Sequence, residues 1–188
     1  MEAYLQITYL NDFVFCPYSI YLHQVFDNSA EEMYSAAPQQ RGKSAHASVD
    51  APKAKSSSKM LQGTYVISNQ LGVYGKIDTL YVNEKRLVER KYQIKTIYRG
   101  YFYQLWSQYF ALLEMGYEVE HISFYSIAER KHYPVPLPGD NEKAELRAHI
   151  RKIARFDFES SFTVNPTKCA NCIYASLCDK THTDHVYA

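Results

Sequence analysis

The stretch from Leu61 to Tyr92, LQGTYVISNQLGVYGKIDTLYVNEKRLVERKY, decides the fold. It is rich in β-branched and aromatic residues and is interrupted by short polar turns, a pattern typical of neighbouring strands. We expect strands at 61–68 and 71–82, joined by a hairpin turn at Asn69-Gln70, and a third short strand at 86–92. The middle of the chain is therefore predicted to be a strand meander.

Helical patterns flank this meander on the N-terminal side. Residues 8–26 are predicted to be helical, with Thr8 as the N-cap and with Pro17 starting or kinking a second segment. Residues 29–50 are mostly helical in pattern and are interrupted near Pro38. Residues 51–60 are small, polar and basic, which predicts a mobile loop before the first strand.

A second set of elements follows the meander. The expected elements are a helix at 100–115 closed by Gly116, strands at 119–127 and 132–135, and a helix from Asp140, as its cap, to about 156. This order predicts one α/β domain over residues 1–188, with a central mixed sheet flanked by helices.

Composition bounds the classes of function. The 188 residues carry a net charge of +1, so any contact with nucleic acid must come from local basic patches. No apolar run approaches the ~20 residues of a membrane span, and the start at Met1-Glu2-Ala3-Tyr4 lacks the basic and apolar regions of a signal peptide. We therefore expect a soluble protein of the cytoplasm with no membrane partner. Its 18 tyrosines suit either base stacking or ordinary packing.

Two strand segments carry charged residues whose spacing suits a metal site. Gly75-Lys76-Ile77-Asp78 is followed by Val88-Glu89-Arg90-Lys91. Residues two apart on a strand face the same side, so Glu89 and Lys91 point together while Arg90 points away. An Asp78 carboxylate on the preceding strand would lie opposite them. Two carboxylates suit Mg²⁺ or Mn²⁺, and the lysine can orient a water or offset transition-state charge. Seen alone, the same motif also fits a surface ion pair.

Residues on two other segments extend this arrangement. His46, in the upstream segment Arg41-Gly42-Lys43-Ser44-Ala45-His46, can supply an imidazole ligand, although a lone histidine is more often packing or surface. Gln104 and Gln108 lie four apart on the predicted 100–115 helix and share one face. Their amides need polar partners, and the carboxylates of the metal site or a phosphate would satisfy them.

Four cysteines form a second pattern. Cys169, Cys172 and Cys178 follow the spacing C-x2-C-x5-C, and Cys16 lies far away in Phe15-Cys16-Pro17-Tyr18. With no sign of secretion, disulfides are disfavoured. Structural zinc usually takes two paired knuckles, whereas iron–sulphur clusters accept asymmetric spacing. Spacing alone leaves zinc and a cluster open, and either would join the N- and C-terminal segments.

The order of these motifs resembles a known family. His46, Gly75-Lys76-Ile77-Asp78, Glu89-Arg90-Lys91 and Gln104-Leu105-Trp106-Ser107-Gln108 together are similar to the RecB-type pattern of the PD-(D/E)-x-K nucleases. With the four cysteines, the chain from Thr8 to Cys178 resembles the small CRISPR-associated RecB-like exonucleases that act in spacer acquisition. The broader RecB pattern usually has Tyr where this chain has Gln108, with Tyr109 next to it.

This resemblance implies a fold, cofactors and partners. The fold would be a RecB-like nuclease core in which residues 165–180 and the Cys16 region hold a four-iron four-sulphur cluster. The protein would be a metal-dependent deoxyribonuclease that cuts single-stranded DNA or overhangs, often from the 5′ end, and trims spacer precursors. Its partners would be the CRISPR integrase and that enzyme's small partner protein.

The resemblance also assigns residues to roles. The implied cluster ligands are Cys16, Cys169, Cys172 and Cys178. The implied Mg²⁺ or Mn²⁺ ligands are His46, Asp78, Glu89 and a main-chain carbonyl, that of Tyr92 in the usual family pattern or that of Arg90. The implied catalytic residues are Asp78, Glu89, Lys91 and Gln104.

Other residues are candidates for DNA contact. Arg147, Arg151 and Arg155 recur with Lys143 every four residues on the predicted last helix and form a basic stripe, while Leu146, Ile150 and Ile153 face the core. Such a stripe is also typical of an ordinary solvated face. Further candidates for DNA contact are Lys43, Gln108 and Tyr109.

Two other functions remain open at this point. One is a stand-alone RecB-like repair nuclease, and the other is a non-catalytic, cluster-bearing scaffold of the integration complex. The intact Asp78, Glu89 and Lys91 argue against the scaffold.

Overall fold

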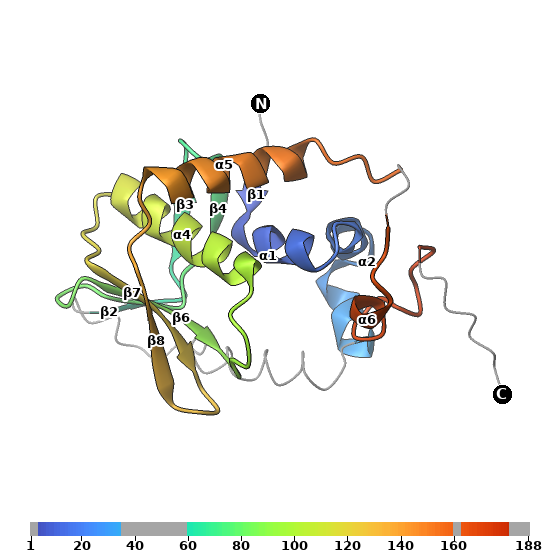
Figure 1. The fold of residues 1–188 in the computed structure, drawn as a ribbon, viewed down its shortest axis with the longest axis horizontal. Coiled ribbons are helices and arrows are strands. Elements are labelled where there is room, and N and C mark those ends of the chain that lie inside the picture. The colour runs from blue at the N-terminus through green and yellow to red at the C-terminus, as the bar shows by residue number, and fades with distance from the viewer. Residues whose placement is uncertain (1–3, 35–59, 160–162, 181–188) are drawn as a thin grey trace.

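The structure is a computed structural model that describes residues 4–34, 60–159 and 163–180 (Figure 1). It is a mixed α/β arrangement of two mixed sheets flanked by helices. The elements, in chain order, are β1 (Leu5–Gln6), α1 (Ile7–Phe15), α2 (Tyr18–Tyr34), β2 (Met60–Gln62), β3 (Tyr65–Ser68), β4 (Val73–Lys76), β5 (Thr79–Tyr81), β6 (Arg86–Lys91), α4 (Arg99–Glu114), β7 (His121–Ser126), β8 (Lys131–Val135), α5 (Asp140–Ala154) and α6 (Pro166–Cys169).

The two sheets differ in size. The smaller has the strand order β1-β4-β3 and the larger has the order β2-β5-β6-β7-β8. β1 pairs with β4, and β6 with β7, in parallel, while the other pairs are antiparallel. In the parallel pair β6–β7, Glu89 lies opposite Phe124 and Lys91 opposite Ser126. This pair places the charged residues of β6 near the middle of the larger sheet.

The predicted hairpin of strands 61–68 and 71–82 is divided between these sheets, which corrects the expectation of two continuous strands. β2 and β5 lie in the larger sheet, whereas β3 and β4 lie in the smaller one. The ribbon bends where Gly63, at φ +58°, lies opposite Asp78, and the Gly63 amide still donates to the Asp78 carbonyl at 3.3 Å. The sequence pattern could not indicate this bend because strand periodicity says nothing about which sheet a strand joins. The turn predicted at Asn69-Gln70 is confirmed.

The N-terminal helices match the expectation in part. The break predicted at Pro17 is confirmed, since α1 ends at Phe15 and α2 begins at Tyr18. Thr8 as N-cap is wrong: the helix begins at Ile7, and the N-cap position is held by Gln6, whose side chain makes no capping bond. Burial explains this difference, because the helix start at Ile7 places that side chain in the core, where it is 2% exposed. The helix predicted at 29–50 is described only as far as Tyr34, and the predicted loop at 51–60 lies outside the described residues except for Met60, which belongs to β2.

Helix α5 begins one residue earlier than expected. Gly139 is the N-cap of α5 and Asp140 is the first helical residue, so the prediction of Asp140 as the cap is wrong. The Gly139 amide donates to the Glu142 carboxylate at 2.9 Å, which fixes the start of the helix. The expected core face of α5 is confirmed for Leu146 and Ile153, which are 0% and 5% exposed.

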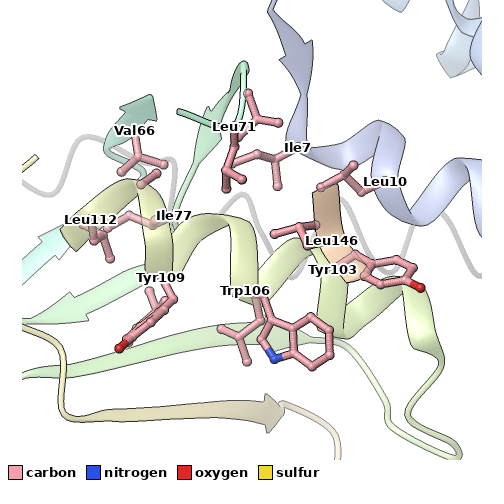
Figure 2. Packing of buried hydrophobic residues seen from close by; sticks show 14 of the residues in the cluster. Ile7, Leu10, Val66, Leu71, Ile77, Tyr103, Trp106, Tyr109, Leu112 and Leu146 are labelled. Atoms are coloured by element: carbon pink, nitrogen blue, oxygen red, sulfur yellow. The ribbon is translucent and has the colours of Figure 1, made fainter. Parts of the chain in front are cut away.

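Helix α4 lies at the centre of the core. Figure 2 shows Trp106, Tyr109 and Leu112 on α4 within the cluster that also holds Val66 and Ile77. α4 contacts α1, β3, β4 and α5, so it touches the smaller sheet on one side and helices on another. Its predicted end at Gly116 is confirmed by a φ of +88°. Leu113, also on α4, is 40% exposed.

Close packing of α1 on α4 depends on one glycine. A Cβ atom added to Gly100 would lie 2.8 Å from the Asn11 Cα and 2.4 Å from its Oδ1. Only a residue without a Cβ fits here, which sets the distance between the two helices. In the described part of the chain, none of the helices is both long and apolar enough to span a bilayer.

Candidate functional site

The charged residues of β6 converge as the strand periodicity predicted. The Lys91 ammonium donates to the Glu89 Oε1 at 2.8 Å, and both side chains face α4. The pair is almost enclosed, since the side chains of Lys91 and Glu89 are 16% and 7% exposed. An ion pair this far from water interacts strongly and is costly to leave half-satisfied.

Asp78 reaches the same place from the bend between β4 and β5. Its Oδ2 accepts a hydrogen bond from the Arg90 amide at 2.6 Å. This bond holds the Asp78 carboxylate against the backbone of β6 at Arg90, the residue between Glu89 and Lys91. Asp78 also acts electrostatically on both of those residues. The three residues predicted for a metal site are therefore neighbours in space.

Two amides from α4 hold the charged groups in position. The Lys91 ammonium donates to the Gln104 Oε1 at 2.9 Å, and the Gln108 Nε2 donates to the Glu89 Oε2 at 2.8 Å. Gln104 and Gln108 are 7% and 3% exposed, so water does not replace these bonds. The expectation that both amides lie on one face is confirmed. Gln108 bonds to a carboxylate of the site as expected, whereas the partner of Gln104 is the Lys91 ammonium and not a carboxylate.

Tyr101 is a member of the site that the sequence analysis missed. The Lys91 Nζ lies 4.7 Å from the centroid of its ring, a favourable cation–π distance. Tyr101 precedes Gln104 by three residues on α4, and residues three apart are neighbours on a helix surface, so helical spacing could have found it. The ring adds a third, less polar contact to the Lys91 ammonium.

The electrostatics favour a cation at this place. Burial raises the pKa of Glu89, and repulsion from Asp78 raises it further, while Lys91 offsets part of the effect. Burial alone would lower the pKa of Lys91, but the attraction of Glu89 outweighs it and the pKa is raised. With both carboxylates ionised, Asp78, Glu89 and Lys91 carry one excess negative charge, which attracts a cation.

The donor set fits a hard metal ion in part. Two carboxylates are typical ligands of Mg²⁺ and Mn²⁺, and the buried Gln108 Oε1 is an acceptor without a hydrogen-bond partner among the described residues. Within 4–34, 60–159 and 163–180, no three Cys, His, Asp or Glu side chains are already grouped as a metal site. His46, the predicted third side-chain ligand, and Lys43 lie outside the described residues.

The backbone carbonyl expected to complete the site is engaged elsewhere. The Tyr92 carbonyl accepts a hydrogen bond from the Ala128 amide at 2.8 Å. One lone pair of that oxygen is therefore committed to the turn after β7. Tyr92 itself lies just past the end of β6, and its side chain is 39% exposed.

The four cysteines line one cavity of about 450 Å³ between the N- and C-terminal segments. All four are free thiols and partly buried. Burial raises the pKa of Cys172, and electrostatic effects of the other three cysteines raise it further, although these described thiols are not already grouped as a metal site. A cavity lined by four thiols has the soft donor set that iron–sulphur clusters and structural zinc both use.

Contacts outside the cysteines also join the two ends of the chain. The Lys168 ammonium donates to the Val14 carbonyl at 2.8 Å, and the Tyr174 hydroxyl hydrogen-bonds the His23 Nδ1 at 2.7 Å. Tyr174, within the knuckle, is 3% exposed and packs with Tyr18 and Leu22 in a small core of its own. The association of the Cys16 region with 163–180 therefore has protein contacts of its own.

The predicted DNA contacts fall in different environments. Tyr109 is 9% exposed and its ring lies against Phe110, which leaves it little surface for a ligand. Gln108 is engaged with Glu89 as described. Arg147 and Arg151 are exposed on α5, and Arg155 is exposed at the C-cap that follows it.

Comparison with known proteins bears on the fold. No protein-family model and no curated protein matches this chain. Among solved structures, the crystal structure of SSO0001 is similar, with a TM-score of 0.62 and 16% sequence identity over 96% of this chain and 88% of that chain. At this identity the likeness concerns the fold alone, and it covers nearly the whole of both chains.

Proposed function

We propose that this chain is a metal-dependent deoxyribonuclease whose catalytic centre is Asp78, Glu89 and Lys91. The observation that carries the proposal is the meeting of two carboxylates and one ammonium, in which the Lys91 Nζ and the Glu89 Oε1 are 2.8 Å apart and almost enclosed while Asp78 is half-buried. Hydrolysis of a phosphodiester needs groups of both signs, because a metal must be held while negative charge develops on the phosphate.

Each residue has a defined task in this proposal. Asp78 and Glu89 would hold the cation, and a bound Mg²⁺ or Mn²⁺ would supply polarisation of the phosphate and activation of a water. Lys91 stabilises the charge that develops on the phosphate and orients the attacking water. Gln104 keeps the Lys91 ammonium in position by accepting its hydrogen bond, and Gln108 does the same for the Glu89 carboxylate by donating one.

The setting we propose follows the motif order and the cysteines. The substrate is single-stranded DNA or an overhang, cut from an end, during processing of spacer precursors for CRISPR adaptation in the cytoplasm. The partners are the CRISPR integrase and its small partner protein. The four cysteines hold a four-iron four-sulphur cluster that fastens Cys16 to the C-terminal knuckle, and the support for this is the shared cavity of four free thiols.

Cleavage of an end-labelled single strand with Mg²⁺ or Mn²⁺ tests the catalytic proposal. Glu89→Gln and Lys91→Met should each lower the rate at least about a hundredfold while circular dichroism stays unchanged. Glu118→Gln is the matched control, because Glu118 is a carboxylate in a surface ion pair with Lys85. A full rate for Lys91→Met, or a rate that persists in excess EDTA, would refute the assignment.

A further inference from the structure

The outer face of the smaller sheet carries large exposed rings. On β3, Val66 and Ser68 are buried at 2% and 1%, whereas Tyr65 and Ile67 are 65% and 42% exposed. Figure 2 shows Val66 and Ile77 in the core beside α4. Because side chains alternate across a strand, Tyr65 and Ile67 on β3 point to the opposite side of the sheet from Val66 and Ser68.

Strand pairing gathers these residues into one surface. Tyr65 lies opposite Lys76, and Ile67 lies opposite Tyr74, which is 38% exposed. The Lys76 ammonium is 5.1 Å from the centroid of the Tyr65 ring. Tyr4, the residue before β1, is 41% exposed and donates from its hydroxyl to the Asn69 Oδ1. The outer face consists of Tyr4, Gln6, Tyr65, Ile67, Tyr74 and Lys76.

The chemistry of this face suits one class of ligand. Solvent-facing positions of an antiparallel sheet are usually polar, but here three of six are tyrosines. None of the six is acidic, and the single charge is a lysine ammonium beside a ring. Flat aromatic surfaces with a cation nearby stack the bases of single-stranded nucleic acid and contact its phosphates. A duplex keeps its bases stacked inside and offers no free base faces to such a surface.

The outer face and the candidate active site lie next to each other in the sequence. Lys76 ends β4, and Asp78 follows two residues later at the bend into the larger sheet. The Lys76 carbonyl also accepts a hydrogen bond from the Gln108 Nε2 at 3.3 Å. A nucleic-acid strand bound next to Lys76 would therefore lie beside the chain segment that leads to Asp78.

We propose that the outer face of the smaller sheet binds single-stranded nucleic acid, with bases stacked on Tyr4, Tyr65 and Tyr74 and a phosphate next to Lys76. This inference rests on the proposed nuclease function, for which it supplies the surface that holds the uncut part of the strand. Tyr65 and Tyr74 supply the main stacking contacts because they lie on neighbouring strands and flank Lys76 and Ile67.

Fluorescence anisotropy of a labelled oligothymidine strand of about twelve nucleotides tests the proposal. Binding is measured in EDTA, so cleavage does not interfere. Tyr65→Ala with Tyr74→Ala should weaken binding at least about tenfold. The matched control, Tyr65→Phe with Tyr74→Phe, keeps both rings and should bind as the unmodified protein does. A strand of the same length that lacks bases should bind weakly and show no loss on removal of the rings.

Several results would overturn the stacking surface. They are equal affinity of the alanine and phenylalanine variants, equal loss on the abasic strand, or no binding of oligothymidine by the unmodified protein. A changed oligomeric state of the alanine variant in size-exclusion chromatography, with unchanged DNA affinity, would instead assign the face to a second copy of the chain. Cleavage is scored separately: if the unmodified protein cuts DNA while the alanine variant binds normally, only the stacking surface fails. If the tyrosine rings govern binding but the unmodified protein does not cut DNA, only the nuclease proposal fails.

Discussion

Replacing Gln108 with Leu tests how the buried carboxylate of Glu89 is held. The change deletes the Nε2 donor that lies 2.8 Å from the Glu89 Oε2, at a position that is 3% exposed. A hydrogen bond to a charged group contributes about 1.5–3 kcal/mol. The change also removes the buried Gln108 Oε1, which has no partner among the described residues and whose burial costs about 1 kcal/mol. The net loss of unfolding free energy is therefore about 0.5–2 kcal/mol.

Urea unfolding followed by circular dichroism measures this loss, and its pH dependence identifies the cause. Burial raises the pKa of Glu89 above its unfolded value, so the folded state keeps its proton longer and stability falls as pH rises from the unfolded pKa toward the folded one. The Gln108 bond favours the ionised form. Removing it raises the pKa further, so Gln108→Leu should cost more at high pH than in acid.

A neighbouring substitution supplies the control. Ser107→Ala removes an uncharged hydrogen bond from the Ser107 hydroxyl to the Tyr103 carbonyl within α4. Its cost should be about 0.5–1.5 kcal/mol and independent of pH. If Gln108→Leu costs the same at both pH values, the bond to Glu89 does not stabilise the ionised carboxylate, and the reasoning about this site is wrong.

Three further predictions concern other parts of the molecule. Cys16→Ser should lower the bound iron, the visible absorption and the melting temperature of anaerobically purified protein, because Cys16 is the only cysteine on the N-terminal side of the cavity. A colourless unmodified protein with one bound zinc would contradict the cluster. Changing Arg147, Arg151 and Arg155 to Gln should weaken single-stranded DNA binding and flatten its salt dependence, and an unchanged salt slope would make the stripe ordinary surface. Gly100→Ala should destabilise by about 1–3 kcal/mol, because its Cβ would meet the Asn11 backbone at 2.8 Å; denaturant unfolding with a loss below about 0.5 kcal/mol would show that α1 and α4 separate easily.

The local arrangement of the site could be predicted from the sequence because it depends on short-range periodicity. The strand period of two placed Glu89 and Lys91 on one side, and the helical spacing of four placed Gln104 and Gln108 on one face. The structure bears out both. The chemistry that these residues perform is a separate matter and stays a prediction.

The features that could not be predicted depend on contacts distant in sequence. The bend at Asp78 is fixed by the Arg90 amide on another strand, and no local pattern indicates such a partner. Thr8 is a favourable cap by propensity, worth about 1 kcal/mol. Burial of Ile7 beneath Gly75 outweighs that preference, since a Cβ on Gly75 would lie 2.9 Å from the Ile7 Cβ.

The separate small core around the cysteines has a consequence for how the molecule opens. It contains three buried side chains, Tyr18, Leu22 and Tyr174, whereas the main core joins both sheets with α1, α4 and α5. Free energies of local opening follow buried apolar contact, so amides around Tyr174 should exchange with solvent well before those of β6 and α4. The Cys16 region and residues 163–180 can then separate while Asp78, Glu89 and Lys91 stay in contact. Whatever stabilises the thiol cavity therefore controls how long these two segments stay associated, without changing the geometry of the carboxylates.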